Sequence, residues 1–337
     1  MNSVPLFLII VTLPLLLGGS GDKPNLKYEN LKYEIKDGTV TITGCDYGAS
    51  GKLVIPATIK GKTVNVISDG AFGGCSNLTS ITIPDTVTSI GLRAFHRCSS
   101  MTNITIPEGV TSIGSRAFFD CSSLTRIAIP DSVTSIGESA FYSCISLTSI
   151  TIPDSITSIA EAAFYSCASL TSISIPDGVT SIGEWAFADC TSLTGINFGK
   201  NSKLTSIGKN ALIGCESLTS IIIPDGVTSI GKSTFSDCKS LTSITIPNNV
   251  IRIEDWAFKS SSSLTSIIIP DSVTSIGDFA FISCSALTAV TFLGDVTRAN
   301  WMVFSRGATP TIYRKPEAKG WGETWGGRPV KLISEKP

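Results

Sequence analysis

The stretch "CSSLTRIAIPDSVTSIGESAF" at Cys121–Phe141 decides the fold, because it returns along the chain with few changes. The next copy, "CISLTSITIPDSITSIAEAAF", begins at Cys144. The alanine before the final phenylalanine, or its equivalent, recurs every 23 residues with a single 25-residue step, at Ala71, Ala94, Ala117, Ala140, Ala163, Ala186, Ala211, Thr234, Ala257 and Ala280. A constant period of roughly 20 to 50 residues is typical of solenoids. The sequence therefore predicts a stack of equivalent coils.

One unit has the pattern of a strand, a turn, a short extended piece that ends with Ile90 in the core, and a helical turn. Leu78, Ile81 and Ile83 are spaced so that the two isoleucines alternate with a threonine, as in a half-buried strand. Pro84 ends the strand, and the apolar positions within Ala94–Cys98 indicate a short helical turn. A single unit cannot bury its apolar side, so its neighbours must cover it. We expect roughly eleven coils about 4.8 Å apart, forming a curved rod on the order of 50 Å long.

This pattern resembles the BspA-type leucine-rich repeat, which "LTSITIPDTVTSIGLRAFHRC" from Leu78 matches nearly word for word. The resemblance covers about residues 53 to 293. It implies a right-handed leucine-rich repeat superhelix with a parallel β-sheet on its concave face and short helical turns or irregular coils elsewhere. It further implies an N-terminal partial repeat over residues 26–70, a repeat array over 71–293 and a C-terminal cap over 294–337. Members of this family are typically secreted or surface proteins implicated in adhesion and protein binding.

The one irregular unit contains "INFGKNSKLTSIG" from Ile196 and is two residues longer than its equivalents. An insertion is tolerated in a turn far better than in a strand. We expect a bulged loop where the strand of this unit ends.

Composition limits the classes of function. Hydrophobic residues make up 42% of the 337 residues and charged residues 16%, so the chain can bury a core under a surface rich in neutral Ser and Thr. The formal net charge is −1, which lacks the basic excess that nucleic acid or an anionic membrane surface would attract. We therefore expect neither as a partner, and nothing in the sequence calls for a cofactor.

The first residues have the pattern of a secretory signal peptide over residues 1–20. An apolar stretch at Leu6–Leu17 is short for a membrane span and is followed by the small residues Gly18, Gly19 and Ser20. No Lys or Arg precedes it, so an uncleaved anchor is the alternative. We expect a monomeric protein that is secreted, periplasmic or held at the cell surface, without a membrane span after cleavage.

Cysteines occupy one position of the repeat. Nine of the ten fall there, with Ser261 replacing one more: Cys75, Cys98, Cys121, Cys144, Cys167, Cys190, Cys215, Cys238 and Cys284. Parallel side chains in successive coils are about 4.8 Å apart, whereas disulfides need Cβ atoms about 3.8 Å apart. We predict a spine of buried thiols, with the state of Cys45 open. No close cysteine pair with histidines is present for zinc, so no metal site is expected.

No set of catalytic residues can be assembled. His96 is the only histidine, and we interpret it as an exposed neutral side chain. A serine or cysteine nucleophile needs a base held by a third group. One acidic residue follows the proline of most units, at Asp85, Glu108, Asp131, Asp154, Asp177, Asp225 and Asp271. One carboxylate per coil supplies too few oxygens for calcium, so turn stabilisation is the favoured role. We predict that the protein is not an enzyme.

The concave strand face is the predicted working surface, because solenoids offer partners such an extended surface. Its positions are Thr82, Thr105, Ala128, Thr151, Ser174, Asn197, Ile222, Thr245, Ile268 and Thr291, flanked by a second row of mostly Ser residues. The departures from this hydroxyl pattern are the candidate ligand-binding residues: Asn103, Arg126, Ile222 and Ile268. Trp185, Trp256 and Phe279 are either exposed anchors or packing across neighbouring coils.

These observations favour a non-enzymatic leucine-rich repeat protein that binds an extracellular or cell-surface protein or glycan, plausibly in adhesion. Three alternatives stay open. The chain can be a structural spacer without a ligand, or an unusual enzymatic solenoid. It can also bind ice through its threonine row, although Ala128, Asn197, Ile222 and Ile268 interrupt that row.

Overall fold

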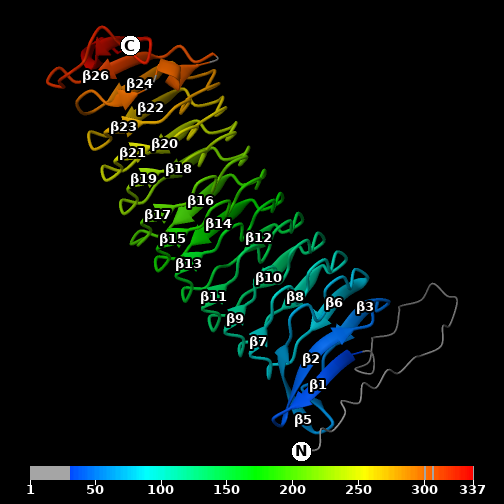
Figure 1. The fold of residues 1–337 in the computed structure, drawn as a ribbon. Coiled ribbons are helices and arrows are strands. Elements are labelled where there is room, and N and C mark those ends of the chain that lie inside the picture. The colour runs from blue at the N-terminus through cyan, green and yellow to red at the C-terminus, as the bar shows by residue number, and fades with distance from the viewer. Residues whose placement is uncertain (1–30, 300, 306, 337) are drawn as a thin grey trace, which may run out of the picture.

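The computed structural model describes residues 31–299, 301–305 and 307–336. The expected signal peptide lies outside these residues. The chain forms a β-solenoid of about 12 turns with parallel strands and almost no helix. It is an elongated rod, with β1 (Leu31–Lys36) at one end and the last strands at the other (Figure 1).

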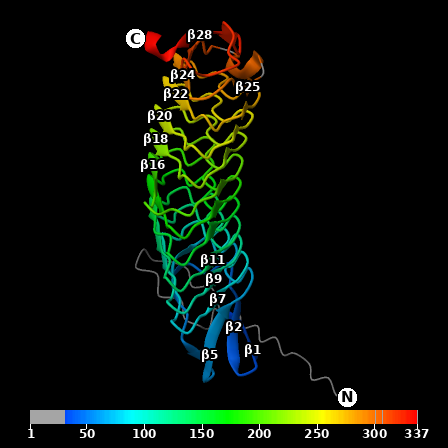
Figure 2. The same cartoon turned by 90° about the vertical axis from the view of Figure 1, so that its left-hand side faces the viewer.

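Two ladders of strands run along the rod. The first carries the alternating isoleucines, and Figure 2 shows part of it along one side of the rod. Its strands are β3 (Gly51–Val54), β6 (Leu78–Thr82), β8 (Asn103–Thr105), β10 (Arg126–Ala128), β12 (Ser149–Ile150), β14 (Ser172–Ile175), β16 (Gly195–Phe198), β18 (Ser220–Ile222), β20 (Ser243–Thr245), β22 (Ser266–Ile269), β24 (Ala289–Phe292), β26 (Thr311–Arg314) and β28 (Arg328–Leu332).

The second ladder is built mostly from the "SI" dipeptide of each unit, where the sequence predicted a short extended piece with its isoleucine in the core. Its strands are β2 (Thr39–Cys45), β5 (Lys62–Ile67), β7 (Ser89–Ile90), β9 (Ser112–Ile113), β11 (Ser135–Ile136), β13 (Ser158–Ile159), β15 (Ser181–Ile182), β17 (Ser206–Ile207), β19 (Ser229–Ile230), β21 (Arg252–Ile253), β23 (Ser275–Ile276) and β25 (Arg298–Ala299). In each two-residue strand up to β23 the isoleucine is buried. One isoleucine per coil therefore anchors this second wall.

The third side of each coil is a run of tight turns, and the predicted helical turn is wrong. The amide N–H groups of Ala94, His96 and Cys98 donate to the carbonyl three residues earlier. Those of Arg93 and Arg97 donate instead to the next coil, at 2.9 Å and 2.8 Å. Both arginines have positive φ, near 55° and 58°. In a helix the backbone hydrogen bonds run along the helix axis and join residues of the same segment. In these turns, every second amide instead forms its hydrogen bond with the neighbouring coil.

The core is a continuous column of side chains. Phe72, Phe95, Phe118, Phe141, Phe164 and Phe187 are fully buried, and successive rings stack with centroids 5.2 to 5.4 Å apart. Leu212 interrupts the column in the irregular coil, and Phe235 resumes it. Because each ring contacts only the coils before and after, burial is shared between neighbours throughout the rod.

The cysteine spine lies beside this column and has hydrogen bonds that sequence analysis did not predict. Each thiol donates to a main-chain carbonyl of the preceding coil; for example, Cys121 Sγ lies 3.1 Å from the Phe95 oxygen. The same contact recurs from Cys98 to Cys284 at 2.9 to 3.3 Å. Eight of the cysteines are free and buried, as predicted.

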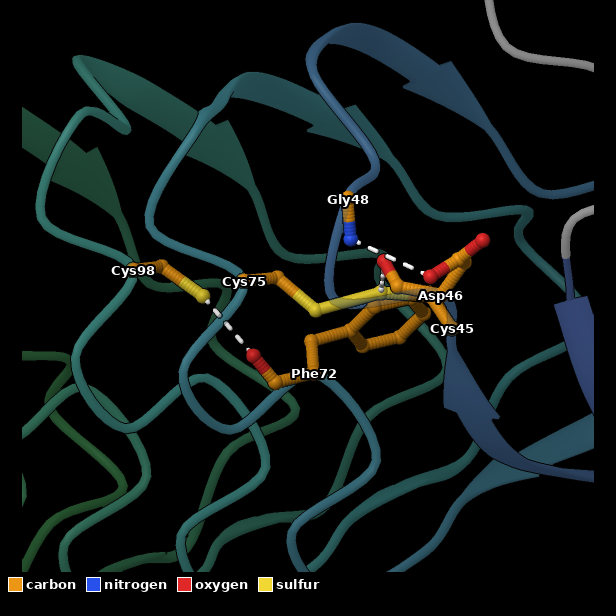
Figure 3. Close-up of a disulfide and its surroundings, with 6 residues drawn as sticks. All are labelled: Cys45, Asp46, Gly48, Phe72, Cys75 and Cys98. Carbon is orange, nitrogen blue, oxygen red and sulfur yellow. Dashed lines mark hydrogen bonds between the residues drawn. A yellow bond between two sulfur atoms is a disulfide. The ribbon is translucent and has the colours of Figure 1, made fainter. Parts of the chain in front are cut away.

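Cys75 is the exception, and its assignment to the thiol spine is wrong. It forms a disulfide with Cys45 at the end of β2 (Figure 3). The bond links the N-terminal segment to the first full coil. In that segment β1 pairs antiparallel with β2, and β4 (Thr58–Ile59) pairs antiparallel with β5. The antiparallel hairpin gives the rod an end that needs no further coil.

At the other end a cluster of aromatic rings covers the last coils. Trp325 lies in β27 (Thr324–Trp325), which pairs antiparallel with β28, and its ring meets Phe292 and Phe304 edge-on at 4.7 Å and 5.8 Å. Two short 3-10 turns complete this end: η2 (Trp301–Phe304) and η3 (Ile333–Glu335).

The irregular coil has its extra residues where we predicted them, directly after β16. The amide of Ser202 donates to the Gly199 carbonyl at 3.1 Å, and that of Lys203 donates to Asp177 in the coil before at 3.0 Å. The insertion is thus a turn held against its neighbour, and the solenoid continues beyond it in register.

Candidate functional site: the strand face

The strand face consists of the outward positions of the first ladder. Strand register places Asn103 directly beside Arg126, and both side chains are exposed. Ile222 lies beside Thr245 in register, and Ile268 occupies the equivalent position one strand further along the chain. The four candidate residues therefore form two separate groups, one in each half of the rod.

The two isoleucines are the most unusual feature of this face. Ile222 is 71% exposed and Ile268 is 55% exposed, although the equivalent positions elsewhere carry mostly Thr, Ser or Asn. Exposed apolar side chains in a polar row are what a binding surface requires, because burying each one in a complex gains about 1 to 2 kcal/mol.

A groove of about 900 Å³ opens beside Ile222. It is lined by strands β14, β16 and β18 and, on one side, by the insertion loop Gly199–Ser202. Gly195 contributes to the groove because an added Cβ there would meet nothing within 4 Å. Sequence analysis located the insertion but did not connect it to a groove. The sequence did contain a signal for the groove: Gly195 is the only residue without a side chain in the row of mostly Ser residues that flanks the strand face.

The insertion loop also lies against Asp177 of the coil before it. Asp177 Oδ1 is buried without a hydrogen-bond partner, and the carboxylate lies against Gly199. The predicted turn-stabilising role does not hold for this oxygen. The turn that contains Asp177 is closed by the main chain, since the Val179 amide donates to the Pro176 carbonyl at 3.1 Å.

Many hydroxyls of the coils bond the backbone. Thr102, Thr125 and Thr148, each two residues before the buried isoleucine of its strand, donate to the equivalent threonine carbonyl of the coil before, at 3.1 to 3.4 Å. Ser132 and Ser155, in the turn after the proline, donate likewise at 2.7 Å and 2.6 Å. These hydroxyls hold coils together. At the far end of the strand face Thr291 is buried, and Lys336 Nζ lies 3.5 Å from its hydroxyl. The unbroken exposed hydroxyl lattice that ice binding needs is absent over the described coils.

Over the described residues, the strand face carries no histidine and no free thiol. His96 lies on the turn side and is half-buried, not exposed as we expected, with its ring 5.1 Å from that of Phe119. Burial raises the pKa of the thiols, to about 12 for Cys144 and Cys190, so they remain protonated. Among the described residues no group of three His, Cys, Asp or Glu side chains is arranged to hold a metal ion.

The described part of the chain contains no helix with the length and hydropathy to cross a bilayer.

Comparison with known proteins agrees with this architecture. The model of the BspA type leucine rich repeat region, a family defined by six copies, matches residues 53–167, 111–238 and 205–313. No curated protein matches the chain.

Solved structures of bacterial proteins are similar to it. A leucine rich cell surface protein from Faecalibacterium prausnitzii is 30% identical, with a TM-score of 0.55, over 86% of this chain and 94% of that one. The leucine rich repeat protein TpLRR from T. pallidum is 30% identical, with a TM-score of 0.54, over 58% of this chain and 91% of that one. The pneumococcal vaccine antigen PcpA shares the fold at 20% identity, with a TM-score of 0.56, over 92% and 93% of the two chains.

The family model covers well over half of the chain, and the repeat that it describes is the coil seen here. Each match spans several coils, so the similarity lies in the repeat itself and is not confined to one end of the array. The chain belongs to the BspA-type leucine-rich repeat family.

Proposed function

We propose that this protein is a non-enzymatic adhesion or recognition protein, positioned outside the cell, that binds an extracellular or cell-surface protein through its strand face. The observation that carries the proposal is the exposure of Ile222 beside the groove formed by the insertion loop. Ile268 extends the same apolar surface toward the C-terminal end. A protein partner suits this surface better than a glycan because the exposed groups are aliphatic and no aromatic ring lines the groove apart from Phe198.

Placement outside the cell is supported by the Cys45–Cys75 disulfide. Disulfides persist in secreted and surface proteins and are rare in the reducing cytosol. The apolar segment of residues 1–20 supplies the export signal in this proposal. N-terminal sequencing of the protein recovered from culture medium or cell envelope tests it, since cleavage near Ser20 is expected and an intact Met1 would contradict cleavage.

The binding test uses a panel of extracellular-matrix proteins and a glycan array as probes. Once a binder is found, we expect Ile222→Ser and Ile268→Ser each to weaken it about tenfold, because each removes about 1.4 kcal/mol of apolar burial. Ile251→Ser is the matched control, since Ile251 is 49% exposed but lies outside the strand face. Equal loss in all three variants, or binding only to glycans, would contradict a protein site centred on Ile222.

A second variant blocks the groove without removing a contact. Gly195→Tyr places a ring into open space within a strand, where aromatic residues are favoured. Ser149→Tyr makes the same change in the same flanking row, two coils earlier among the regular units. We expect binding to be lost in the first variant and kept in the second, with both proteins melting like the wild type. If the protein binds none of the probes, the alternative of a structural spacer without a ligand is favoured.

A further inference from the structure

A column of aromatic rings runs along the turn side of the rod, away from the strand face. The rings of Phe119, Tyr142 and Tyr165 come from three successive coils and stack with centroids 4.5 Å and 4.6 Å apart. His96 extends the column at one end and Trp185 at the other, at 5.1 Å and 6.1 Å. All five are half-buried. The buried phenylalanine column already fills the core, so this outer column is additional apolar surface.

The stacking geometry decides what this column can bind. Phe119 and Tyr142 are within 5° of parallel, as are Tyr142 and Tyr165 within 4°, so each ring covers the face of the next. A sugar stacks on an open ring face, and here the column presents ring edges to solvent. An apolar ridge of ring edges suits a second protein surface with a matching ridge.

Charge is distributed unequally along the column. Three basic residues, Arg93, Arg97 and Arg116, lie near its His96 end with a single acid, Asp120. Glu184 and Asp189 lie at its Trp185 end, with Lys209 3.1 Å from Glu184. Glu184 accepts from the Trp185 indole at 2.9 Å, and a hydrogen bond to Asp189 raises the pKa of Tyr165 to about 12.

Backbone conformation shows that bulky residues are held at this surface at a cost. Arg93, Arg116 and Trp185 occupy one repeat position with φ of 55°, 56° and 58°, where Gly70 and Asn210 also lie. This position has positive φ in every coil from Gly70 to Phe279, and the left-handed conformation disfavours large side chains there.

From this arrangement we propose that the aromatic column is a self-association surface, on which a second copy of this chain packs antiparallel about a two-fold axis at Tyr142. A second copy has the same coil spacing, so its ridge matches the first coil by coil. Arg97 and Asp189 occupy equivalent positions two coils on either side of Tyr142. The axis therefore brings Arg97 of each copy to Asp189 of the other, as an isologous interface requires.

Both charges already have a neighbour in their own chain, and Asp189 accepts a hydrogen bond from Tyr165. Arg97 is 3.6 Å from Asp120 in its own chain, in an exposed pair that contributes little. The same axis brings Phe119 of one copy to Tyr165 of the other, and Arg93 to Trp185. The column is only five coils long, so the interface falls below the standard size and the dimer is weak and concentration-dependent. This replaces our sequence-based expectation of a monomer.

The first measurement is sedimentation velocity of the purified chain from about 1 to 200 μM, a range that covers weak association. We expect a reversible monomer–dimer equilibrium. A single monomeric species at every concentration overturns the proposal, and so does a dimer that the variants below leave unchanged.

Charge reversal tests the axis. Arg97→Glu alone and Asp189→Arg alone each place like charges together twice per dimer, and we expect the midpoint concentration to rise at least tenfold. Mixing the two variant chains restores opposite charges at both contacts and should recover the wild-type midpoint. Lys239→Glu is the matched control, since Lys239 pairs with Glu216 at 2.7 Å on the turn side outside the column. Failure of the mixture to recover, with both chains folded, overturns the antiparallel register.

Cross-linking supplies an independent readout. Tyr142→Cys places one accessible thiol on the axis, while the eight native free thiols are buried. Mild oxidation should join two such chains covalently. Lys259→Cys, at the same repeat position five coils away, should cross-link several-fold more slowly. Equal rates for the two variants overturn the placement of the axis.

Discussion

The Ser261 hydroxyl donates to the carbonyl oxygen of Phe235 at 2.8 Å, in the position that a cysteine thiol takes in the neighbouring coils. Cys284 makes the equivalent bond to Phe258 at 2.9 Å. Within the ten units from Ala71 to Ala280, the one without a cysteine therefore keeps the donor and lacks the sulfur. This substitution indicates that the spine position selects a small hydrogen-bond donor and not only a small apolar group.

Replacing Cys167 separates the contribution of its hydrogen bond from that of its apolar volume. Cys167→Ala removes the 3.2 Å contact to the Phe141 carbonyl together with the sulfur volume, and should lower the free energy of unfolding by about 1 to 2 kcal/mol. Cys167→Ser keeps a donor, as Ser261 does, and should cost less. Urea denaturation of both variants measures the order. If the alanine variant is the more stable one, the thiol acts only as apolar filling.

Sequence analysis predicted the solenoid, its repeat and the buried thiols because all three depend on periodicity. Its predictions were wrong where contacts between separate segments of the chain, and not the local pattern, decide the structure. The turns at Arg93–Arg97 look helical in sequence, since their apolar spacing is helical, but bonds to the next coil decide their conformation. Cys75 was grouped with the spine by position alone, and only the fold of the N-terminal segment brings Cys45 to it.

The same limit applied to the candidate surfaces. Ile222 and Ile268 were identified because they break a hydroxyl row, and both are exposed. The groove beside Ile222 and the aromatic column through Tyr142 depend on how neighbouring coils stack. One sequence shows the residue types but not which rings face one another.

Thiol reactivity follows from burial. The pKa of Cys98 is raised to about 12 and that of Cys144 likewise, in both cases mainly by burial, so thiolate is negligible at pH 8. We expect the native protein to show no rapid reaction with a disulfide reagent. Unfolding in guanidinium should expose eight thiols, and reduction in addition should give all ten. Ten thiols without reduction would contradict the disulfide.

Acid should destabilise the coil that contains His96. Partial burial lowers the pKa of His96, with further lowering by Arg97, Arg93 and Arg116 against an opposing contribution from Asp120. The unfolded chain therefore binds the proton more readily, and stability is lost as pH falls below about 6.5. His96→Phe removes this contribution while continuing the ring column. We expect the urea midpoint of the wild type to fall more between pH 7.5 and 5.5 than that of the variant; equal falls would refute the assignment.

Glycines at the bend before the turn side allow close contact between coils. A Cβ on Gly137 would overlap the backbone of Gly114 and Ser115. At Gly231, in the equivalent position, the nearest atom is the Thr234 hydroxyl oxygen at 3.2 Å. Gly137→Ala should therefore cost about 1 to 3 kcal/mol, and Gly231→Ala less than about 1 kcal/mol. Thermal unfolding of the two variants measures the difference, and equal melting temperatures would show that the coils separate freely.

Excising one whole coil is the most direct test of the architecture. Removal of Cys215–Asp237 joins Gly214 to Cys238 and keeps the 23-residue register. Cys238 then takes the place of Cys215, whose thiol donates to the Phe187 carbonyl at 3.2 Å. Because each coil contacts only its neighbours, the shortened chain should fold with a cooperative transition and a smaller radius of gyration by X-ray scattering.

A half-coil deletion is the matched control. Removing residues 215–226 deletes half as much chain, but it places the strand of one coil against the turns of the next. The isoleucines and the phenylalanine of the coil at the junction then lose their partners in the coil before, and the rest of the C-terminal half loses its support. We expect this smaller deletion to unfold the C-terminal half, while the larger one leaves it intact. A half-coil variant that melts like the whole-coil variant would mean that the rod is not held together by coil-to-coil register.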